Sequence, residues 1–454
     1  MSKRIAVKWW VLIAIGTGSF MATLDASVVN IILPILKDAF NSNVATIEWV
    51  VTVYLIVISG MLLTFGKLGD LKGHKTIYQW GFGIFIVFSG LSGGAWSPTS
   101  LVIFRAMQAI GGAMLASNAA AIVTDNFPQD ERGRAFGLLS IMTYLGLTVG
   151  PVLGGWLTHV FSWRMVFFIN IPIGLLALFL SQRFIPKDTP ADLGQQFDVI
   201  GAILFMAGLS TLMLGLNKGA EWGWGSPAIL GVLFAALIIL WIFIQTQKCV
   251  STPMLDLTLF RNRVFTLSTI TSVFNYMAIY SLIFLMPFYL IEGRGFDPRY
   301  AGILLSVQSV FMAITAPISG YASDKIGSRV PGMIGLGAMS IGFLLLSIID
   351  QATGLWVIVL GIAIIGFGTG SFISPNTSAL MGSAPKSQRG VASAMQAEAR
   401  SFGMVLGIGM AGAIFTTQLA ANTSQALYEG VSKGFLAAAL VAALGVITSH
   451  FKER

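Results

Sequence analysis

The chain has 454 residues, of which 55% are hydrophobic and only 10% are charged, and its mean hydropathy is +0.81. Soluble domains carry about 25% charged residues, so this composition excludes a soluble globular protein and indicates an integral membrane protein. The net charge of +8 would suit a nucleic-acid partner, but the distribution of the basic residues explains the charge without one.

Fourteen hydrophobic segments follow one another along the chain. Each is close to the roughly 20 residues that a helix needs to cross a hydrocarbon core of about 30 Å. We expect helices, because a helix satisfies its own backbone hydrogen bonds in lipid. The first segment is too long for the core of a signal peptide, so we expect it to be kept as a membrane span. The segments lie at about 9–34, 45–65, 76–95, 99–123, 135–160, 163–182, 198–216, 227–247, 264–291, 299–321, 330–349, 353–378, 388–418 and 431–449.

Asp25 is an ionisable residue inside the first of these segments. A charged side chain at the bilayer centre costs about 3 kcal/mol or more, so such residues usually serve the passage of ions or polar substrates. Asp25 is expected roughly 12 Å below the outer surface, and Arg105 roughly 9 Å below it. The pair could bind and release a coupling proton, with Arg105 controlling the charge of Asp25. The alternative is a static pair that only neutralises both charges.

Two loops predicted to face the cytoplasm repeat one pattern. A glycine is followed after four residues by an aspartate, after three more by a second glycine and after two more by a base. The residues are Gly66, Asp70, Gly73 and Lys75, with a further base at Lys72, and Gly320, Asp324, Gly327 and Arg329. We expect a cytoplasmic gate, in which a carboxylate stabilises a helix N-terminus or pairs with an arginine across two halves. The alternative is that the positive charges only anchor the topology.

The repeat indicates a duplicated architecture, because each loop follows the second helix of a six-helix half. It divides the chain into an N-terminal six-helix bundle at 1–184, an inserted helix pair with cytoplasmic linkers at 185–262, and a C-terminal six-helix bundle at 263–454. Asp198, which precedes Gly201, is expected to cap the first inserted helix.

Polar and aromatic residues inside the predicted helices are candidates for substrate contact. Glu398, expected roughly 15 Å from the cytoplasmic side, could attract cations, bind a second proton, or pair with a base such as Arg400 and only hold helices together. Tyr276, Tyr280 and Phe284 share one stripe of a helix and could bind flat hydrophobic or cationic molecules, or pack against other helices. The other candidates for a cavity lining are Asn30, Tyr54, Gln108, Asn118, Tyr144, Asn275, Gln308 and Asn376.

The basic residues predict the orientation. With the N-terminus inside, 19 of the 27 Lys and Arg residues lie in cytoplasmic segments and six in external ones, as the positive-inside rule requires. Both termini are therefore expected in the cytoplasm. Cys249 is the only cysteine and there are three histidines, so we expect no disulfide framework, no metal and no other cofactor.

Several motifs carry a family resemblance. The loop from Gly66 to Lys75 resembles the helix 2–3 signature of the major facilitator superfamily, and Arg105-Ala-Met-Gln108-Ala-Ile-Gly111-Gly112 resembles its helix 4 motif. The residues Gly146, Gly150, Pro151, Gly154 and Gly155 resemble the helix 5 motif of its antiporters, although their spacing also suits close helix packing, with a kink at Pro151. The stretches Leu24–Asn30, Trp163–Gly174 and Leu255–Arg263 resemble the fourteen-helix drug:proton antiporter family. Glu398 departs from that pattern, because relatives usually carry a small polar residue there.

The resemblance implies an all-α polytopic membrane protein with two six-helix bundles plus two inserted helices, fourteen transmembrane helices in all. It implies multidrug efflux, that is, proton-coupled export of hydrophobic or cationic compounds from the cell by alternating access, with no enzymatic reaction. We expect a plasma-membrane protein whose partners are protons, a small substrate and lipid, and which functions as a monomer. The main alternative is a dedicated exporter of one lipid or metabolite on the same scaffold; a nutrient importer or a channel is a weaker one.

Overall fold

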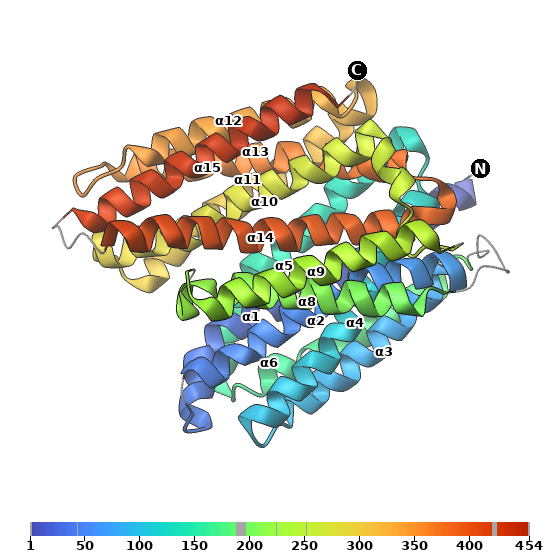
Figure 1. Cartoon of the computed structure of the whole chain (residues 1–454), viewed down its shortest axis with the longest axis horizontal. Coiled ribbons are helices and arrows are strands. Elements are labelled where there is room, and N and C mark those ends of the chain that lie inside the picture. Colours follow the sequence, from blue (N-terminus) through green and yellow to red (C-terminus); the bar gives the residue numbers. More distant parts are fainter. Residues whose placement is uncertain are drawn as a thin grey trace.

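The computed structural model describes residues 2–42, 44–187, 197–223, 225–250, 252–419 and 425–452. Throughout these ranges the regular elements are helices (Figure 1). The α-helices are α1 (Ser2–Ala39), α2 (Val44–Lys72), α3 (His74–Gly93), α4 (Pro98–Asn126), α5 (Arg132–Val160), α6 (Met165–Phe168), α7 (Asn170–Phe184), α8 (Val199–Trp222), α9 (Pro227–Cys249), α10 (Arg263–Pro287), α11 (Pro298–Ile326), α12 (Arg329–Ser347), α13 (Leu355–Ser383), α14 (Arg389–Leu419) and α15 (Ala426–His450). Short 3-10 or π turns are η1 (Gln129–Glu131), η2 (Leu257–Arg261), η3 (Phe288–Gly293) and η4 (Lys386–Gln388).

Each predicted hydrophobic segment falls on a helix, and α6 and α7 share the sixth. Within the described residues, 12 helices are long and apolar enough to cross a membrane, or 13 if the bent α5 is counted as one span. Helix α3 is not among them. In α5 the parts 129–150 and 152–160 meet at 40°, where the sequence predicts a kink, although the side chain of Pro151 lies outside the described residues. The chain is thus a multi-pass membrane protein, and fourteen spans remain a prediction.

Local signals set several helix starts. Ser97 and Ser100 form a reciprocal capping box at the start of α4, each side chain accepting the other's backbone N–H at 3.1 Å. The predicted cap of the first inserted helix is confirmed, because Asp198 accepts the N–H of Gly201 at 2.8 Å. Asn262 accepts the N–H of Val264 at 3.0 Å and so begins α10.

The helices run nearly along one direction, with α1–α4 in the lower part of Figure 1 and α10–α15 in the upper part. Both chain ends lie on the same side of the molecule, at the right of that view. One buried hydrophobic cluster joins the N-terminal helices to α8, α9 and parts of α10, α13 and α14, and a second joins α10 to α15. Between them, α5 packs on α11 and α14 packs on α2.

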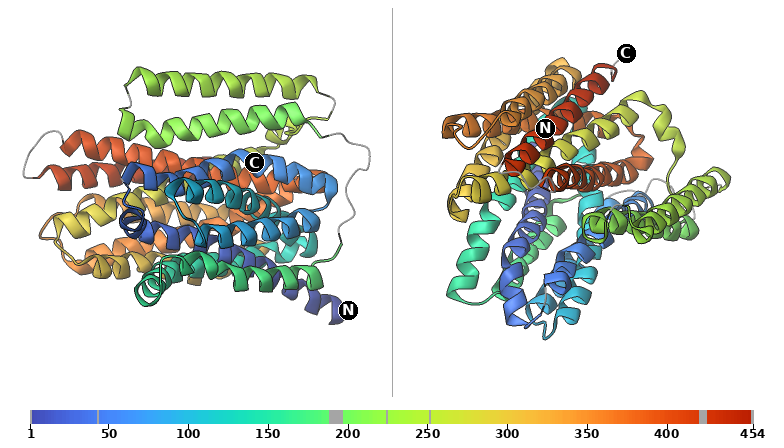
Figure 2. Two further views of the ribbon diagram at one scale, coloured as in Figure 1. Left: turned by 90° about the horizontal axis from the view of Figure 1, so that it is seen from below. Right: turned by 60° about the vertical axis from the view of Figure 1, so that its left-hand side comes forward.

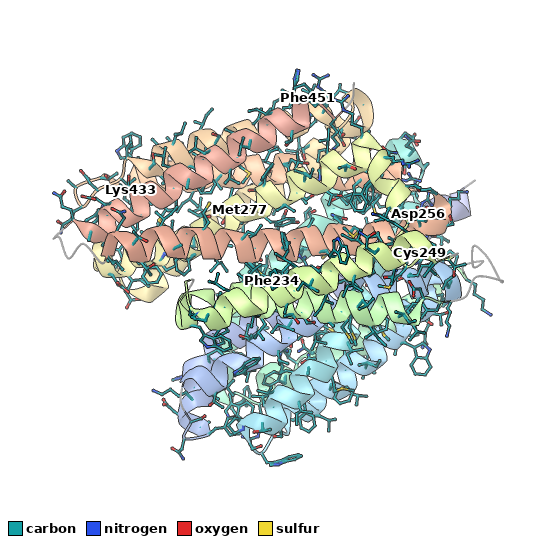
Figure 3. All side chains as sticks on the ribbon, viewed as in Figure 1. Phe234, Cys249, Asp256, Met277, Lys433 and Phe451 are labelled. Atoms are coloured by element: carbon teal, nitrogen blue, oxygen red, sulfur yellow. The ribbon has the colours of Figure 1, made fainter. Side chains whose placement is uncertain are left out.

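Helices α8 and α9 form a hairpin on one side of the molecule, which Figure 2 shows as a separate green layer. The hairpin is bound through α8, which contacts both α2 and α14. Helix α9 faces outward, and its Phe234, labelled in Figure 3, is 66% exposed. Large exposed apolar side chains such as Trp241 and Trp356 are ordinary for a surface that meets lipid.

Candidate functional site

Asp25 is the centre of a buried hydrogen-bond network. Its Oδ2 accepts a hydrogen bond from the Arg105 guanidinium at 2.6 Å, and its Oδ1 accepts from the amides of Gln108 at 3.1 Å and Asn170 at 2.8 Å. Both charged residues are only 1% exposed. The predicted pairing of Asp25 with Arg105 is therefore present, and the carboxylate is held by an ion pair and two amide donors.

The guanidinium of Arg105 has further contacts. It donates to the Gln108 side chain at 2.8 Å and to the Val50 carbonyl at 3.4 Å. Its carbon atom lies 4.3 Å from the centre of the Tyr54 ring, a cation–π distance. Tyr54 and Gln108, both predicted to line a substrate cavity, are thus direct neighbours of the ion pair.

Asn170 and Ser89 complete the network, and the sequence analysis did not select them as site residues. Asn170 donates to the Ser89 hydroxyl at 3.0 Å, and that hydroxyl donates to the Phe167 carbonyl at 2.9 Å. Both are fully buried. Asn170 lies in the Trp163–Gly174 stretch, which was used only as a family signature; a buried amide at the start of a membrane helix was the available signal. Ser89 gave no such signal.

The glycine stripe of α5 packs against α1 beside Asp25. A Cβ atom at Gly146, Gly150 or Gly154 would come closer than 3.0 Å to side chains of α1 that lie two or three residues from Asp25 in the chain. The hydroxyl of Ser27 also donates to the Gly146 carbonyl at 3.2 Å. Gly155 has nothing within 4 Å of such an atom, so it lies off this contact. The stripe therefore brings the helix with the antiporter-like motif directly against the helix that carries Asp25.

Two aspartates of the repeated loops cap helices of the opposite half. Asp70 accepts the backbone N–H groups of Gly390 at 2.7 Å and Val391 at 3.1 Å, at the start of α14. Asp324 accepts those of Gly133 at 2.8 Å and Arg134 at 2.9 Å, at the start of α5. The N-terminus of a helix favours negative charge, so each carboxylate binds the two halves together at one end of the bundle.

The capped helices start with a second internal repeat that the sequence analysis missed. Proline, three residues, arginine and glycine occur at Pro128–Gly133 and again at Pro385–Gly390. The glycines meet those of the first repeat, because a Cβ at Gly66 would lie closer than 3.0 Å to the Gly390 carbonyl, and one at Gly320 equally close to the Gly133 carbonyl. This matching P-x3-R-G spacing was the sequence signal that could have identified the helix starts that Asp70 and Asp324 cap.

The basic residues Lys75 and Arg329 of the two loops each bind another helix of their own half. Lys75 donates to backbone carbonyls at the end of α7, including that of Gln182 at 3.1 Å. Arg329 donates to His450 at the end of α15 at 2.9 Å. Lys72 is exposed, and the glycines at 73 and 327 both have left-handed backbone, with φ of 95° and 81°. The aspartates therefore connect the halves, whereas Lys75 and Arg329 each fasten their own half.

The loop after the inserted pair also contacts the start of α14. Asp256, labelled in Figure 3, accepts a hydrogen bond from Gln388 at 3.0 Å. Burial by itself would raise the pKa of the Asp256 carboxyl, but hydrogen bonds from Thr258 and Gln388 outweigh it and hold the pKa below its usual value. The Asp256–Gln388 contact ties the inserted pair to the residue just before Arg389 and Gly390.

Three tyrosines from both halves lie in electrostatic range of one arginine, and a fourth tyrosine lies in range of one of the three. Arg400 on α14 lies in electrostatic range of the phenol groups of Tyr54 on α2 and of Tyr276 and Tyr280 on α10. Tyr144 on α5 is in range of Tyr276. Tyr54 and Tyr144 are about 5% exposed, whereas the two tyrosines of α10 keep more accessible surface. The structure thus brings three predicted lining residues into electrostatic range of a cation that was predicted only as a partner of Glu398, with Tyr144 next to one of them.

Two predicted residues are buried without a hydrogen-bond partner. Both amide atoms of Asn275 and both carboxyl oxygens of Glu398 lack one in the described part of the chain. Glu398 shares its face of α14 with Ala394 and Gly390, which contact α2 at Gly66. Since Arg400 lies two residues further along, the two charged side chains leave α14 in different directions, as the sequence predicts.

The remaining predicted lining residues lie elsewhere. The side-chain amide of Asn376 has hydrogen-bond partners on both its nitrogen and its oxygen inside the C-terminal half. It donates to the Ser268 carbonyl at 3.0 Å and the Ser272 hydroxyl at 2.8 Å and accepts from Lys452 at 2.8 Å. Asn118 binds His74 at 2.8 Å, next to Asp70. Gln308 is 6% exposed, and its amide nitrogen has no partner among the described residues. The side chain of Asn30 lies outside the described residues.

The chain was compared with known families and proteins. A family model described as Major Facilitator Superfamily matches residues 15–408 and 268–451. The riboflavin transporter RibZ of Clostridioides difficile (strain 630) is 32% identical over 452 residues, which cover 98% of each chain. The multidrug resistance protein Stp of Mycobacterium tuberculosis is 30% identical and the multidrug transporter protein MdtP of Bacillus subtilis 31%; the matches cover 92% of this chain and 78% and 76% of theirs.

Solved structures share the fold. The human organic anion transporter MFSD10 superimposes with a TM-score of 0.70 at 14% identity, over 97% of this chain and 99% of that one. The proton:xylose symporter XylE superimposes with a TM-score of 0.69 at 15% identity, over 98% and 95%. At such identities the likeness concerns the fold alone.

Proposed function

This chain belongs to the major facilitator superfamily and is a membrane transporter rather than an enzyme, and we propose that it exports hydrophobic or cationic compounds in exchange for protons. The observation that carries the proposal is the Asp25–Arg105 pair, buried and joined to two amides. A buried ion pair adds little stability over apolar residues of the same size. A titratable pair inside a membrane helix bundle therefore suits a proton carrier better than a structural support.

The proton step follows from the geometry of this network. When a proton binds Asp25, the carboxylate loses its charge and its attraction for Arg105 weakens. The guanidinium is then free to strengthen its contact with Tyr54, which lies 4.3 Å away and faces the tyrosine cluster. Protonation would in this way change the region in which substrate contacts are proposed. The residues proposed for these contacts are Tyr54, Gln108, Tyr144, Asn275, Tyr276, Tyr280, Asn30 and Asn376. Glu398, buried without a partner, is proposed as a second proton or selectivity site.

Alternating access requires the cytoplasmic contacts to open and close. Asp70 and Asp324 are proposed to hold the closed gate through their helix caps, and Gly66 and Gly320 to permit the close approach of the halves. Lys75 and Arg329 would keep each half rigid during the motion. The α5 glycines would let α1 and α5 move as one unit around Asp25.

We further propose the finer classification. The chain would be a fourteen-span drug:proton antiporter with bundles 1–184 and 263–454 and an inserted pair 185–262. It would sit in the plasma membrane with both termini in the cytoplasm and act as a monomer. The excess of basic residues on the loops beside the termini, the hairpin of α8 and α9, and relatives named for multidrug resistance support this classification.

The test is transport into proteoliposomes under an imposed pH gradient, with several unrelated dyes. We expect gradient-dependent movement by the wild-type chain, its loss in Asp25→Asn, and a change in rate or substrate range in Glu398→Gln. Transport that ignores the gradient, or conduction without counterflow, would refute the antiporter proposal.

A second candidate is a transporter of one planar metabolite, which the similarity to a riboflavin transporter over 98% of both chains favours. Riboflavin included as a competitor separates the two candidates. Inhibition by riboflavin with no movement of unrelated dyes would favour the single-metabolite transporter, whereas movement of many dyes would favour the multidrug exporter.

A further inference from the structure

Arg400 is a cation in the interior of α14 whose charge no other group in the described residues directly balances. It lies eleven residues into the helix, roughly 17 Å from its cytoplasmic end. The structure gives Arg400 no ion pair and no hydrogen bond within the residues it describes, only longer-range electrostatic contacts. Arg105, the buried arginine of the central region, is paired with Asp25 at 2.6 Å. Arg400 is half-buried and, unlike Arg105, has no direct acidic partner among the described residues.

Glu398 does not neutralise Arg400 by direct contact. The charges of Glu398 and Arg400 interact at longer range, but no ion pair within 4.0 Å joins them. Among the described residues, both carboxyl oxygens of Glu398 are without a hydrogen-bond partner. The register explains this, because side chains two residues apart on a helix leave it on different sides. Glu398 lies on the side of Gly390 and Ala394, toward α2.

Arg400 instead lies on the side of α14 that packs on α10. Gly403, one turn further along, approaches Tyr276 so closely that a Cβ there would lie 2.8 Å from the tyrosine Cβ. Tyr280 is one turn from Tyr276 on α10, and Tyr54 lies on α2 in the other half; both are in electrostatic range of Arg400. Three phenol groups from two helices, on opposite sides of the interface between the halves, are thus in electrostatic range of the guanidinium.

We infer that Arg400, with Tyr54, Tyr276 and Tyr280, forms a subsite for an aromatic group that carries a negative charge or an electronegative edge. A guanidinium binds carboxylate-like oxygens through two parallel hydrogen bonds. Tyrosine rings stack on a flat ring and tolerate many ring types. A permanent cation would gain the stacking but meet the like charge of Arg400.

The inference rests on the proposed function and narrows its substrate class. Among the hydrophobic compounds proposed above, aromatic acids would bind this subsite better than cationic dyes of the same shape. Arg400 is thus assigned as the residue that sets the charge preference of this subsite.

The test compares two dyes that share one three-ring scaffold and differ in charge: fluorescein, an anion near neutral pH, and a rhodamine methyl ester, a cation. Binding to the full chain in lipid nanodiscs is followed by fluorescence anisotropy without a pH gradient. We expect the wild-type chain to bind fluorescein at least about tenfold more tightly, the ratio that corresponds to about 1.4 kcal/mol. We expect Arg400→Gln to abolish most of that ratio.

Two further variants separate charge from ring contact. Arg400→Lys keeps the charge but loses the paired hydrogen bonds, so it should keep the preference for fluorescein at reduced strength. Tyr276→Leu should weaken both dyes alike, because stacking does not depend on their charge. Lys433→Gln is the matched control. Lys433 lies near the start of α15, at the left of Figure 3, where its side chain is half exposed beside Glu429. This variant should change the affinity for neither dye.

A wild-type chain that binds the cationic dye as tightly as fluorescein overturns the inference. So does an unchanged dye ratio in a folded Arg400→Gln, or, if that variant does not fold, in Arg400→Lys. Because binding is measured without a gradient, a chain with the expected dye ratio but no gradient-driven transport would refute the proton coupling and leave this subsite intact.

Discussion

The carboxylate of Asp70 on α2 accepts a hydrogen bond at 2.7 Å from the N–H of Gly390, which lies 320 residues later at the start of α14. The same arrangement recurs with the halves exchanged, where Asp324 accepts the N–H of Gly133 at 2.8 Å. The chain has therefore duplicated both members of this contact, the loop aspartate and the helix start that it caps. Each half supplies one of each, which makes the contact between the halves at this end of the bundle nearly symmetric.

Removing either cap should favour separation of the halves at the cytoplasmic side. Hydrogen bonds to a charged acceptor are worth about 1.5–3 kcal/mol each, and Asp70→Asn or Asp324→Asn removes that charge. With the exposed Cys249 replaced by serine, spin labels at the exposed Gln129 and Lys386 report the distance between the halves. We expect longer distances in each variant.

The control for the caps is Asp130→Asn, which removes an exposed charge in η1. It should leave the distance distribution unchanged. Wild-type distances in both Asp70→Asn and Asp324→Asn would show that the carboxylates do not hold the gate.

A methyl group at Gly66 or Gly320 should destabilise the closed protein. In each case the added Cβ would lie closer than 3.0 Å to a backbone carbonyl of the other half, and a backbone atom cannot rotate out of the way. Overpacking of this kind costs about 1–3 kcal/mol. We expect Gly66→Ala and Gly320→Ala to unfold at lower temperature in calorimetry and to show the opening described above.

Gly83→Ala provides the matched comparison, because nothing lies within 4 Å of a Cβ at that position of α3. Alanine is about 1 kcal/mol better than glycine inside a helix, so this variant should unfold at the same or a higher temperature. Equal melting of Gly66→Ala and Gly83→Ala would contradict the close approach.

Asn170→Leu should slow proton-driven transport. The change removes the amide that donates to Asp25 at 2.8 Å and to Ser89 at 3.0 Å. One such hydrogen bond to a charged acceptor is enough to alter a rate by at least about tenfold. The measurement is the initial rate in proteoliposomes under a pH gradient, with substrate exchange in the absence of a gradient expected to fall less.

Asn126→Leu is the control for this variant, because the Asn126 amide donates only to the Ile122 carbonyl of its own helix, at 2.8 Å. A wild-type rate in Asn170→Leu would mean that Asn170 has no part in the function of the Asp25 network.

Asn376→Ala should lower stability more than substrate affinity. Its side chain makes four hydrogen bonds to Ser268, Ser272, Thr271 and Lys452, so its loss leaves several buried groups unpaired, at about 1–3 kcal/mol each. The unfolding temperature should fall while the dissociation constant for dyes stays near that of the wild type. A large loss of affinity at unchanged stability would instead favour the substrate contact that the sequence predicts.

Parts of the site were readable from the sequence for identifiable reasons. Asp25 and Arg105 were found because charge inside an apolar segment is rare, and their depths follow from a fixed rise per residue. Asp70 and Asp324 were found because a repeated spacing needs no knowledge of contacts. Asn170 was missed as a site residue, since a neutral amide in a helix gives no sign of the partner that it will meet 145 residues away in the chain.

Composition, helix positions, the internal duplication and the buried charges were therefore determined by the sequence itself, because each depends on hydrophobicity, on helical periodicity or on a repeated order of residues. Only the tertiary structure decided which groups meet. It joined Asp25 to Asn170, and it placed Asp70 and Asp324 in the contact between the halves, each at the start of a helix of the opposite half. The physical reason is that these contacts depend on the rotation of each helix about its axis and on how closely glycines let helices approach, and both are set by packing across the whole bundle.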